Sequence, residues 1–212
     1  MDLNEISKYL CFILRHAPES VGVTMDSHGW VSIDELIEKV NAKGKCVLNE
    51  GLISLLQATD EKSRYEIKEG KIRCVQGHSI PWVEPDIMYQ EPPELLYHGT
   101  NSSAATKIID SGCISRMKRH HVHMSADPQV AWKSACRWSS GMPTVMVIKA
   151  HKMYEDGKSL GKTSNDVWCV DKVPTKYVYQ VISDEKEIYK MISEYKKGAM
   201  KNESNKNVIG QT

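Results

Sequence analysis

The chain has 212 residues, of which 41% are hydrophobic and 26% are charged, and its formal net charge is +1. This length allows one large domain or two small ones, and the composition excludes a disordered chain. The near-neutral charge argues against bulk coating of nucleic acid, but it allows a local basic pocket that binds a single phosphate group.

The hydrophobic residues form only short runs. The longest, such as Val145–Ile148, fall far below the roughly 20 residues of a membrane-spanning helix. The first ten residues include acids and lack an uninterrupted apolar core. Six scattered cysteines without a Cys-x-x-Cys pair favour reduced core residues over a disulfide framework or a zinc site. We therefore expect no signal peptide, no membrane association and a cytoplasmic location.

Residues 1–80 combine helical periodicity with a hairpin. Apolar residues recur at helical spacing from Glu5 to Leu14, and a short strand, a turn and a second short extended piece are expected in 21–32. Ser32 is expected to cap a second helix, with Glu35 at capping-box spacing, and Asn49 to begin a third. Two alternating runs flank Glu69-Gly70, which indicates a tight hairpin. Three helices and a hairpin predict a winged-helix module.

A proline-rich stretch at 81–93 is expected to be a linker. Beyond it the pattern predicts a β-rich lobe over residues 94–183. Its candidate strands lie at 94–99, 121–125, 144–150, 166–170 and 175–182, and its candidate helices at 104–110 and 129–137. The polar C-terminal tail, residues 184–212, is expected to begin as a helix and then to become irregular.

The chain has no glycine-rich phosphate loop, no H-E-x-x-H motif and no G-x-S-x-G nucleophile elbow. Candidate chemistry lies where Arg and His coincide. The planar fork of Arg binds phosphate, and His can donate or move a proton near neutral pH. Five segments have this character: Arg15-His16, Arg64, Gln76–Ser79, His98–Thr100 and Arg119–His123.

Three of these segments also have a structural explanation. Arg15-His16 can compensate a helix dipole, Arg64 can be a solvated hairpin residue, and His98–Thr100 can be a turn that ends a strand.

Strand alternation would place Arg119, His121 and His123 on one face, which would line a wet cleft or be exposed. His120 and His121 could bind a metal ion. However, no carboxylate or cysteine spacing supports a metal site, and we expect none.

Seven motifs occur in an order that is specific when they are taken together. They are SKYLCFILRHAPE, GWVSIDELI, RYEI, IRCVQGHS, PPELLYHGT, RHHVHMSAD and DVWCV. In these motifs the chain resembles the NAD-dependent RNA 2′-phosphotransferase family, whose enzymes remove the splice-junction 2′-phosphate from tRNA. The resemblance covers about Ile6 to Val181.

The resemblance implies an α+β protein with an N-terminal winged-helix lobe that binds the RNA phosphate and a C-terminal ADP-ribosyltransferase-like lobe that binds NAD. The family's essential Arg-His-Arg-Arg set corresponds to the catalytic residues Arg15, His16, Arg64 and Arg119, with Arg73 as the alternative to Arg64. The RNA phosphate would be held by Arg15, His16, Arg64 and His78.

The same resemblance places NAD-binding residues in the C-terminal lobe. They are His98, Gly99, Thr100, His123, Ser125 and Val167. Val167 stands where protein-modifying relatives carry a catalytic Glu. A phosphate monoester is already an anionic nucleophile at pH 7, so an apolar residue there is chemically coherent.

The expected partners are an RNA that bears a 2′-phosphate and NAD as co-substrate, with no metal and no obligate protein partner. Two alternatives stay open. The chain could be an ADP-ribosyltransferase that caps terminal phosphates of RNA or DNA, or a non-catalytic winged-helix nucleic-acid binder.

Overall fold

The computed structural model describes residues 1–209, with side chains through Gly198. It is a mixed α/β structure with several small sheets. The chain divides into two compact units. The N-terminal unit comprises Met1–Met88, Met117–His121 and Lys162–Asp166, and the C-terminal unit comprises Tyr89–Arg116, Val122–Gly161 and Val167–Thr212.

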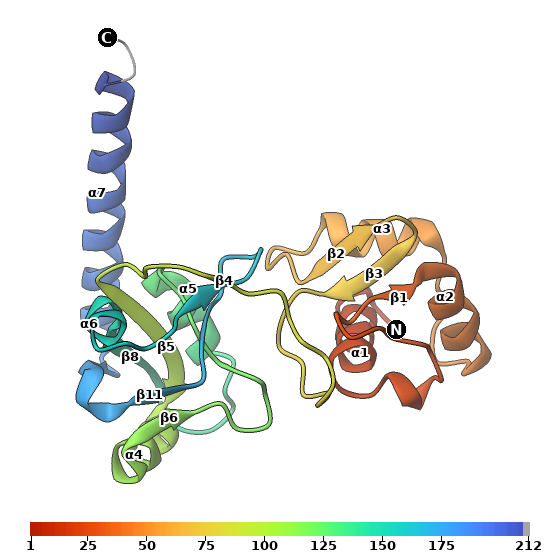
Figure 1. Ribbon diagram of the computed structural model, residues 1–212, viewed down its shortest axis with the longest axis horizontal. Helices are drawn as coiled ribbons and strands as arrows, with labels where there is room; N and C mark the ends of the chain where they lie inside the picture. Colours follow the sequence, from red (N-terminus) through yellow and green to blue (C-terminus); the bar gives the residue numbers. More distant parts are fainter. Residues whose placement is uncertain (210–212) are drawn as a thin grey trace. The chain divides into compact units, whose positions relative to one another are not determined.

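The N-terminal unit contains three helices and a three-stranded antiparallel sheet of order β1-β3-β2 (Figure 1). Its elements are α1 (Leu3–His16), a 3₁₀ turn (Pro18–Ser20), β1 (Val31–Ser32), α2 (Ile33–Ala42), α3 (Glu50–Ala58), β2 (Tyr65–Lys68) and β3 (Lys71–Cys74).

The helix starts are set by side-chain caps. Ser32 and Asn49 accept hydrogen bonds from the first turns of α2 and α3, which confirms the predicted cap at Ser32 and the predicted helix start at Asn49. The spacing of Glu35 suggested a full capping box in α2, but this carboxylate instead accepts from Thr24, at 2.8 Å from its backbone nitrogen. The full capping box is in α1, between Asp2 and Glu5.

The hairpin prediction is confirmed. Lys68 pairs with Lys71, and the two turn residues between them, Glu69 and Gly70, have φ angles of 50° and 71°. A two-residue turn with positive φ at both positions matches the right-handed twist of the strands that it joins.

The strand expected in the first part of 21–32 is wrong. Val21 and Val23 are buried in the core without joining a ladder, and only Val31–Ser32 forms a strand. Burial of alternate valines therefore reproduced a strand pattern in an irregular segment.

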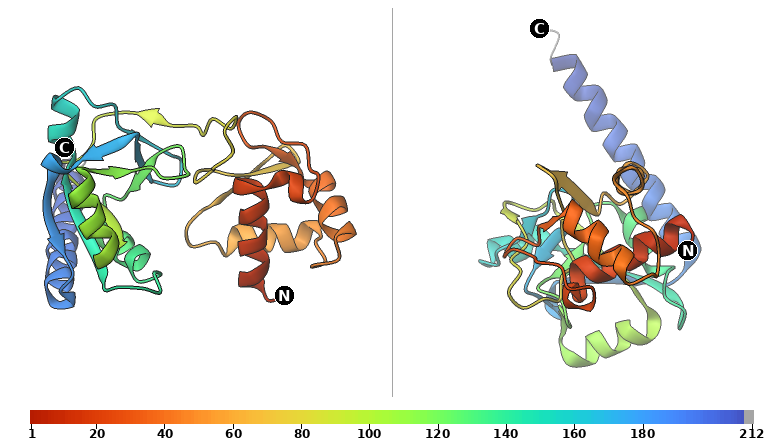
Figure 2. Two further views of the ribbon diagram at one scale, coloured as in Figure 1. Left: turned by 90° about the horizontal axis from the view of Figure 1, so that it is seen from below. Right: turned by 90° about the vertical axis from the view of Figure 1, so that its right-hand side faces the viewer.

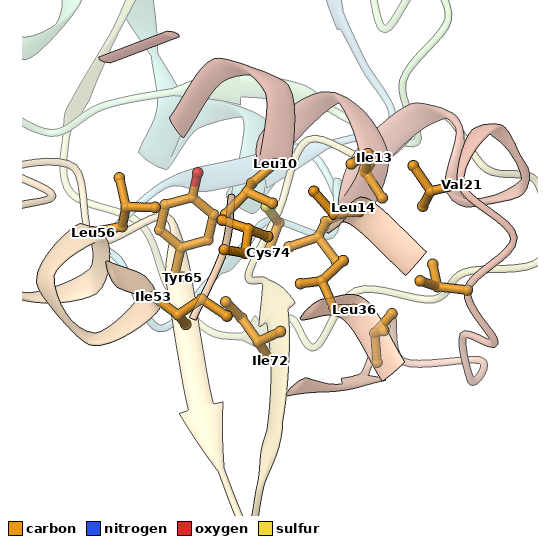
Figure 3. Close-up of a cluster of buried hydrophobic side chains, with 14 of the residues drawn as sticks. Leu10, Ile13, Leu14, Val21, Leu36, Ile53, Leu56, Tyr65, Ile72 and Cys74 are labelled. Carbon is orange, nitrogen blue, oxygen red and sulfur yellow. The ribbon is translucent and has the colours of Figure 1, made fainter. Parts of the chain in front are cut away.

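The core of the N-terminal unit lies between α1, the other helices and the hairpin (Figure 3). Tyr65 belongs to this core, and its hydroxyl is directed toward α1. The residues labelled in the figure include Leu10, Ile13, Leu14, Leu36, Ile53, Leu56 and Ile72, which are all buried.

The C-terminal unit holds the larger share of strands (Figure 2). The order in the described chain is β4 (Met88–Tyr89), β5 (Leu95–Asn101), α4 (Ser102–Ser111), β6 (Cys113–Ser115), β7 (Val122–Met124), α5 (Pro128–Ala135), β8 (Pro143–Lys149), α6 (Ala150–Glu155), β9 (Gly161–Lys162), β10 (Trp168–Val170), β11 (Lys172–Pro174), a 3₁₀ turn (Thr175–Tyr177), β12 (Val178–Ile182) and α7 (Glu185–Ile209).

These strands form sheets of order β12-β8-β5, β4-β9-β10-β7 and β11-β6. One face of β5 and β8 is covered by α5 and the first turns of α7, through a cluster that includes Tyr97, Ala131, Val147 and Ile188. Side chains on the opposite face, such as Leu96 and Met146, belong to a second cluster that also includes Trp168.

The helix α7 is longer than the sequence pattern predicted. It continues to Ile209 instead of becoming irregular, and its later turns extend away from the sheet that its first turns cover (Figure 1). Its sequence contains no proline that would interrupt the backbone hydrogen bonds. Within residues 1–209, each helix is too short or too polar to cross a bilayer.

Candidate active site

Arg15 lies in the last turn of α1, one and two helical turns beyond Cys11 and Ser7 on the same face. Its Nε and Nη2 atoms are buried and have no hydrogen-bond partner among the described residues. Gly77 packs against the guanidinium, since a Cβ at Gly77 would lie 3.4 Å from Cζ of Arg15. Burying donors without acceptors is costly, so this arrangement is suited to an anionic ligand with at least two oxygens.

His16 follows Arg15 and ends the helix. Its Nδ1 lies 2.9 Å from Oγ of Ser79. Partial burial, followed by the positive charges of Arg15 and Arg119, lowers the pKa of His16. The imidazole is therefore neutral at pH 7, with one ring nitrogen as donor and the other as acceptor.

Arg64 begins the hairpin and lies beside α1. Its Nη1 is 3.1 Å from Oδ1 of Asp60, whose side chain is only 3% exposed, and 3.4 Å from Oγ of Ser7. The hydroxyl of the neighbouring Tyr65 lies 2.7 Å from the Ser7 carbonyl oxygen and donates to it. These contacts hold Arg64 next to the face of α1 that carries Arg15. A solvated hairpin arginine would lack such contacts.

Cys11 adds a titratable thiol to this cluster. A hydrogen bond from Cys74, together with the charges of Arg15 and Arg64, lowers the pKa of Cys11 although burial acts in the opposite direction. Burial raises the pKa of Cys74. Negative charge is therefore favoured on the Cys11 thiol, beside the two arginines.

His78 belongs to the loop Gly77–Ile80, in which Gly77 and Ser79 contact Arg15. Its side chain is 1% exposed, and neither ring nitrogen has a hydrogen-bond partner among the described residues. Burial, followed by the charge of Arg15 and further basic groups, lowers the pKa of His78 to about 4. The ring is neutral at pH 7 and acts as a buried polar group, not as a cation.

Arg119 belongs to the N-terminal unit, as part of Met117–His121. The predicted strand through Arg119 and His121 is wrong, because the strand begins only at Val122 and the preceding residues form a bend. His120 anchors this bend. Its Nε2 lies 2.8 Å from the carbonyl oxygen of Ile80 and donates to it. Arg119 is close enough to His16 for its charge to lower the histidine pKa.

Arg73, the alternative to Arg64, is occupied by other groups. Its guanidinium contacts Glu66 at 2.7 Å and Asp86 at 2.6 Å, and it stacks on Trp30 with 4.4 Å between Cζ and the ring centroid. Two carboxylates already neutralise this arginine, so its geometry is that of a structural ion pair.

In the C-terminal unit, His98 and Thr100 lie inside β5. The alternative interpretation of this segment as a strand-ending turn is therefore wrong. Nδ1 of His98 lies 2.9 Å from the carbonyl oxygen of His123 in β7. Because a carbonyl oxygen only accepts, this nitrogen carries the proton and the ring orientation is set by the neighbouring strand.

Gly99 lies on the opposite face of β5. A Cβ at this position would clash with the carbonyl oxygen of Ala131 in α5. The missing side chain therefore allows α5 to approach the strand. Thr100 is 3% exposed and pairs with Thr144 of β8.

Ser125 follows β7 and pairs through its backbone with Tyr97 of β5. Its Oγ accepts a hydrogen bond from the backbone nitrogen of Asp127 at 3.0 Å, just before α5. Val167 immediately precedes β10, whose residue Cys169 pairs with His123. The structure thus brings the predicted C-terminal residues onto the linked strands β5, β7 and β10.

Sequence reasoning missed two residues of this arrangement. Asp60 orients Arg64, and Ser79 contacts His16. Ser79 ends the motif IRCVQGHS, which indicates no separate role for it. An isolated Asp before a hairpin carries no sequence signal. Among residues 1–198 the side chains form no group of three His, Cys, Asp or Glu residues placed to hold a metal ion.

Comparison with known proteins gives consistent matches over most of the chain. Residues 2–172 match the family described as "RNA 2'-phosphotransferase, Tpt1 / KptA family". A protein of Pseudomonas syringae pv. tomato named "Probable RNA 2'-phosphotransferase" is 39% identical over 180 residues, which cover 84% of this chain and 94% of the relative. Similar proteins with the same name occur in Flavobacterium johnsoniae, at 39% identity over 82% of this chain and 93% of the relative, and in Rhodopirellula baltica, at 38% over 81% and 92%.

Proposed function

Because the chain belongs to the RNA 2'-phosphotransferase, Tpt1 / KptA family, and is thus a transferase that removes a 2′-phosphate from RNA, we propose that it transfers this phosphate to NAD in two steps. The observation that carries the proposal is the buried guanidinium of Arg15, with two donor nitrogens that lack a partner among the described residues.

In the first step, an oxygen of the RNA 2′-phosphate attacks the anomeric carbon of the nicotinamide riboside. The bond from carbon to nitrogen breaks, and nicotinamide leaves. In the second step, the adjacent ribose 2″-hydroxyl attacks phosphorus and releases its proton to solvent. The bond from phosphorus to the RNA 2′-oxygen breaks, and this oxygen takes a proton. The products are RNA with a 2′-hydroxyl, ADP-ribose 1″,2″-cyclic phosphate and nicotinamide.

Arg15, Arg64 and Arg119 are proposed to bind the phosphate and to stabilise the charge that builds on its equatorial oxygens in the second step. His16, neutral at pH 7, is proposed to donate a hydrogen bond to the phosphate or to the leaving 2′-oxygen, which takes its proton from solvent. His78, which was predicted to bind the phosphate, is buried, so we propose instead that it supports the loop Gly77–Ile80 to which it belongs. The twofold negative charge of a phosphate monoester near neutral pH suits a cluster of arginines.

NAD is proposed to bind to the C-terminal unit. His98, Thr100, His123 and Ser125 lie on or directly after β5 and β7, and they can hydrogen bond to the hydroxyl and phosphate groups of a dinucleotide. Gly99 supports this surface by letting α5 pack against β5. Val167 supplies an apolar residue where no general base is needed, because the attacking phosphate is already anionic.

The fold assignments belong to the same proposal. Residues 1–80 are proposed to be a winged-helix lobe, 81–93 a linker, 94–183 an ADP-ribosyltransferase-like lobe and 184–212 a polar extension. The helices α1 to α3 followed by the β2–β3 hairpin support the first assignment. A cytoplasmic location and independence of metal ions and of an obligate protein partner complete the proposal.

The test is incubation of the purified chain with NAD and a 2′-phosphorylated oligonucleotide in the presence of a chelator. We expect nicotinamide, cyclic phosphate and dephosphorylated RNA by mass analysis. A stable ADP-ribosylated RNA as sole product would instead indicate a capping transferase. Activity that is lost in chelator and restored by magnesium would refute metal independence.

A binding titration tests the phosphate site separately. The 2′-phosphorylated oligonucleotide should bind much more tightly than the same sequence without this phosphate, and the salt dependence should be modest because few phosphates are neutralised. Equal affinity with a steep salt slope would indicate a general nucleic-acid-binding surface.

A further inference from the structure

The loop Gly77–Ile80 contacts Arg15, His16 and His120. Gly77 packs against the guanidinium of Arg15, and the backbone nitrogen of Ser79 donates to the carbonyl oxygen of Arg15 at 2.9 Å. The carbonyl oxygen of Ile80 accepts from Nε2 of His120, next to Arg119. Four consecutive residues therefore tie the end of α1 to the bend that carries Arg119.

The side chain of Ser79 has the most specific contact in this loop, which is the 2.9 Å approach of its Oγ to Nδ1 of His16. We infer that Ser79 is a positioning residue that donates its hydroxyl proton to Nδ1 of His16 and thereby fixes the tautomer in which Nε2 carries the proton. This inference rests on the proposed function, in which His16 donates a hydrogen bond to the phosphate or to the leaving RNA oxygen.

The chemistry of the substrate selects this direction for the hydrogen bond. Phosphate oxygens and the leaving 2′-oxygen are acceptors, so the ring nitrogen that faces them must be a donor. In a neutral imidazole the other nitrogen is then an acceptor, and it needs a donor such as a hydroxyl. The backbone contact between Ser79 and Arg15 places the serine side chain at Nδ1 and leaves Nε2 for the substrate.

The surroundings of His16 favour a neutral ring. The tautomer of this ring then decides which nitrogen is the donor. Three basic groups face it: Arg15 from its own helix, Arg119 from the bend, and His78 from the same loop as Ser79. None of these side chains supplies a negative charge that would stabilise an imidazolium ion. A hydrogen bond to a neutral hydroxyl orients the ring without creating such a charge.

The experiment uses Ser79→Ala and Ser79→Thr in the full chain. We expect Ser79→Ala to slow the second step about tenfold, with smaller change in nicotinamide release, because the misoriented tautomer cannot donate at Nε2. Ser79→Thr keeps the hydroxyl and should restore most of the rate. Ser20→Ala is the matched control, since its hydroxyl donates to the Ala17 carbonyl oxygen near the same helix end.

Nitrogen-15 NMR of the substrate-free protein provides a readout that does not depend on turnover. The His16 resonances, assigned by their loss in His16→Gln, should show a protonated Nε2 in the wild type and a mixture of tautomers in Ser79→Ala. An unchanged tautomer, or an unchanged second step, overturns the inference. If the wild type gives no cyclic phosphate, the proposed function fails, while the NMR result still decides what Ser79 does to His16.

Discussion

The two units organise their candidate residues in different ways. In the N-terminal unit, the important contacts join side chains from α1, the hairpin, the loop at Gly77–Ile80 and a bend far along the chain. In the C-terminal unit, the candidates are consecutive or paired positions of β5 and β7, and the backbone ladder places them.

This difference determines which substitutions should affect each unit most. Under the proposed function, the cluster of side chains loses activity when one group is altered, because each donor would meet the ligand directly. A strand-based surface tolerates side-chain changes at its rim but depends on the close approach of helix and sheet.

The largest expected effect is structural and lies in the C-terminal unit. Gly99→Ala would place a methyl group against the Ala131 carbonyl oxygen, which is backbone and cannot move aside without displacing α5. We expect the free energy of unfolding to fall by about 3 kcal/mol or more. Thermal denaturation followed by circular dichroism measures this. Gly198→Ala, where a Cβ would meet open space, is the control and should not destabilise the chain.

The second prediction concerns chemistry in the N-terminal unit. Arg15→Ala and Arg64→Ala should slow the second step about 10²-fold, or about 3 kcal/mol each, because charge on phosphorus grows in that step. Arg15→Lys should rescue poorly, since a point charge cannot replace two donors of a fork. Rapid-quench analysis should show ADP-ribosylated RNA accumulating.

Arg73→Lys is the control and should have a smaller effect on the second step, because Glu66 and Asp86 already form ion pairs with Arg73. Equal slowing of both steps in both alanine variants would contradict this division of roles.

The sequence was sufficient for elements whose signal is local. The apolar periodicity of α1, the caps Ser32 and Asn49 and the Glu69-Gly70 turn each depend on a few neighbouring residues, and all are present in the structure. Short pairings such as β6 with β11 escaped prediction. Each of these two strands has only one buried residue, and the partners lie far apart in the chain.

For the candidate site, too, local patterns identified some features and missed those that depend on distant contacts. Motif order identified the Arg and His residues, but it could not place Arg119 within the N-terminal unit, because that depends on the hydrogen bond between His120 and the Ile80 carbonyl oxygen. Nor could it show that Gly99 serves helix packing. Both facts arise from contacts between distant segments, which local patterns do not encode.

The third prediction uses the buried His78 and pH. Its pKa is lowered to about 4 in the folded chain, from an ordinary value near 6.5, so the unfolded chain binds the proton more readily. Stability should therefore be unaffected by His78 above pH 6.5 and should be lost progressively as the pH falls from 6.5 to about 4, by roughly 3 kcal/mol in total. Urea unfolding at several pH values measures this, with His78→Gln as the comparison. An equally steep pH dependence in His78→Gln would assign the loss to other groups.

The smallest expected effect tests whether the side-chain network of the N-terminal unit extends along α1. Ser7 lies two turns before Arg15, and its Oγ contacts Nη1 of Arg64 at 3.4 Å and the Tyr65 hydroxyl at 3.0 Å. Ser7→Ala removes both contacts but leaves the hydrogen bond that the Tyr65 hydroxyl donates to the Ser7 carbonyl oxygen.

We therefore expect Ser7→Ala to lower the free energy of unfolding by about 1 kcal/mol, and to slow the second step only a few-fold, because Asp60 still orients Arg64. Thr106→Ala is the matched control in the C-terminal unit, where the exposed hydroxyl donates to the Ser102 carbonyl oxygen within α4. A similar rate loss in both variants would show that the effect of Ser7 is general destabilisation. A loss confined to Ser7→Ala would show that Arg64 depends on the face of α1 that also carries Arg15.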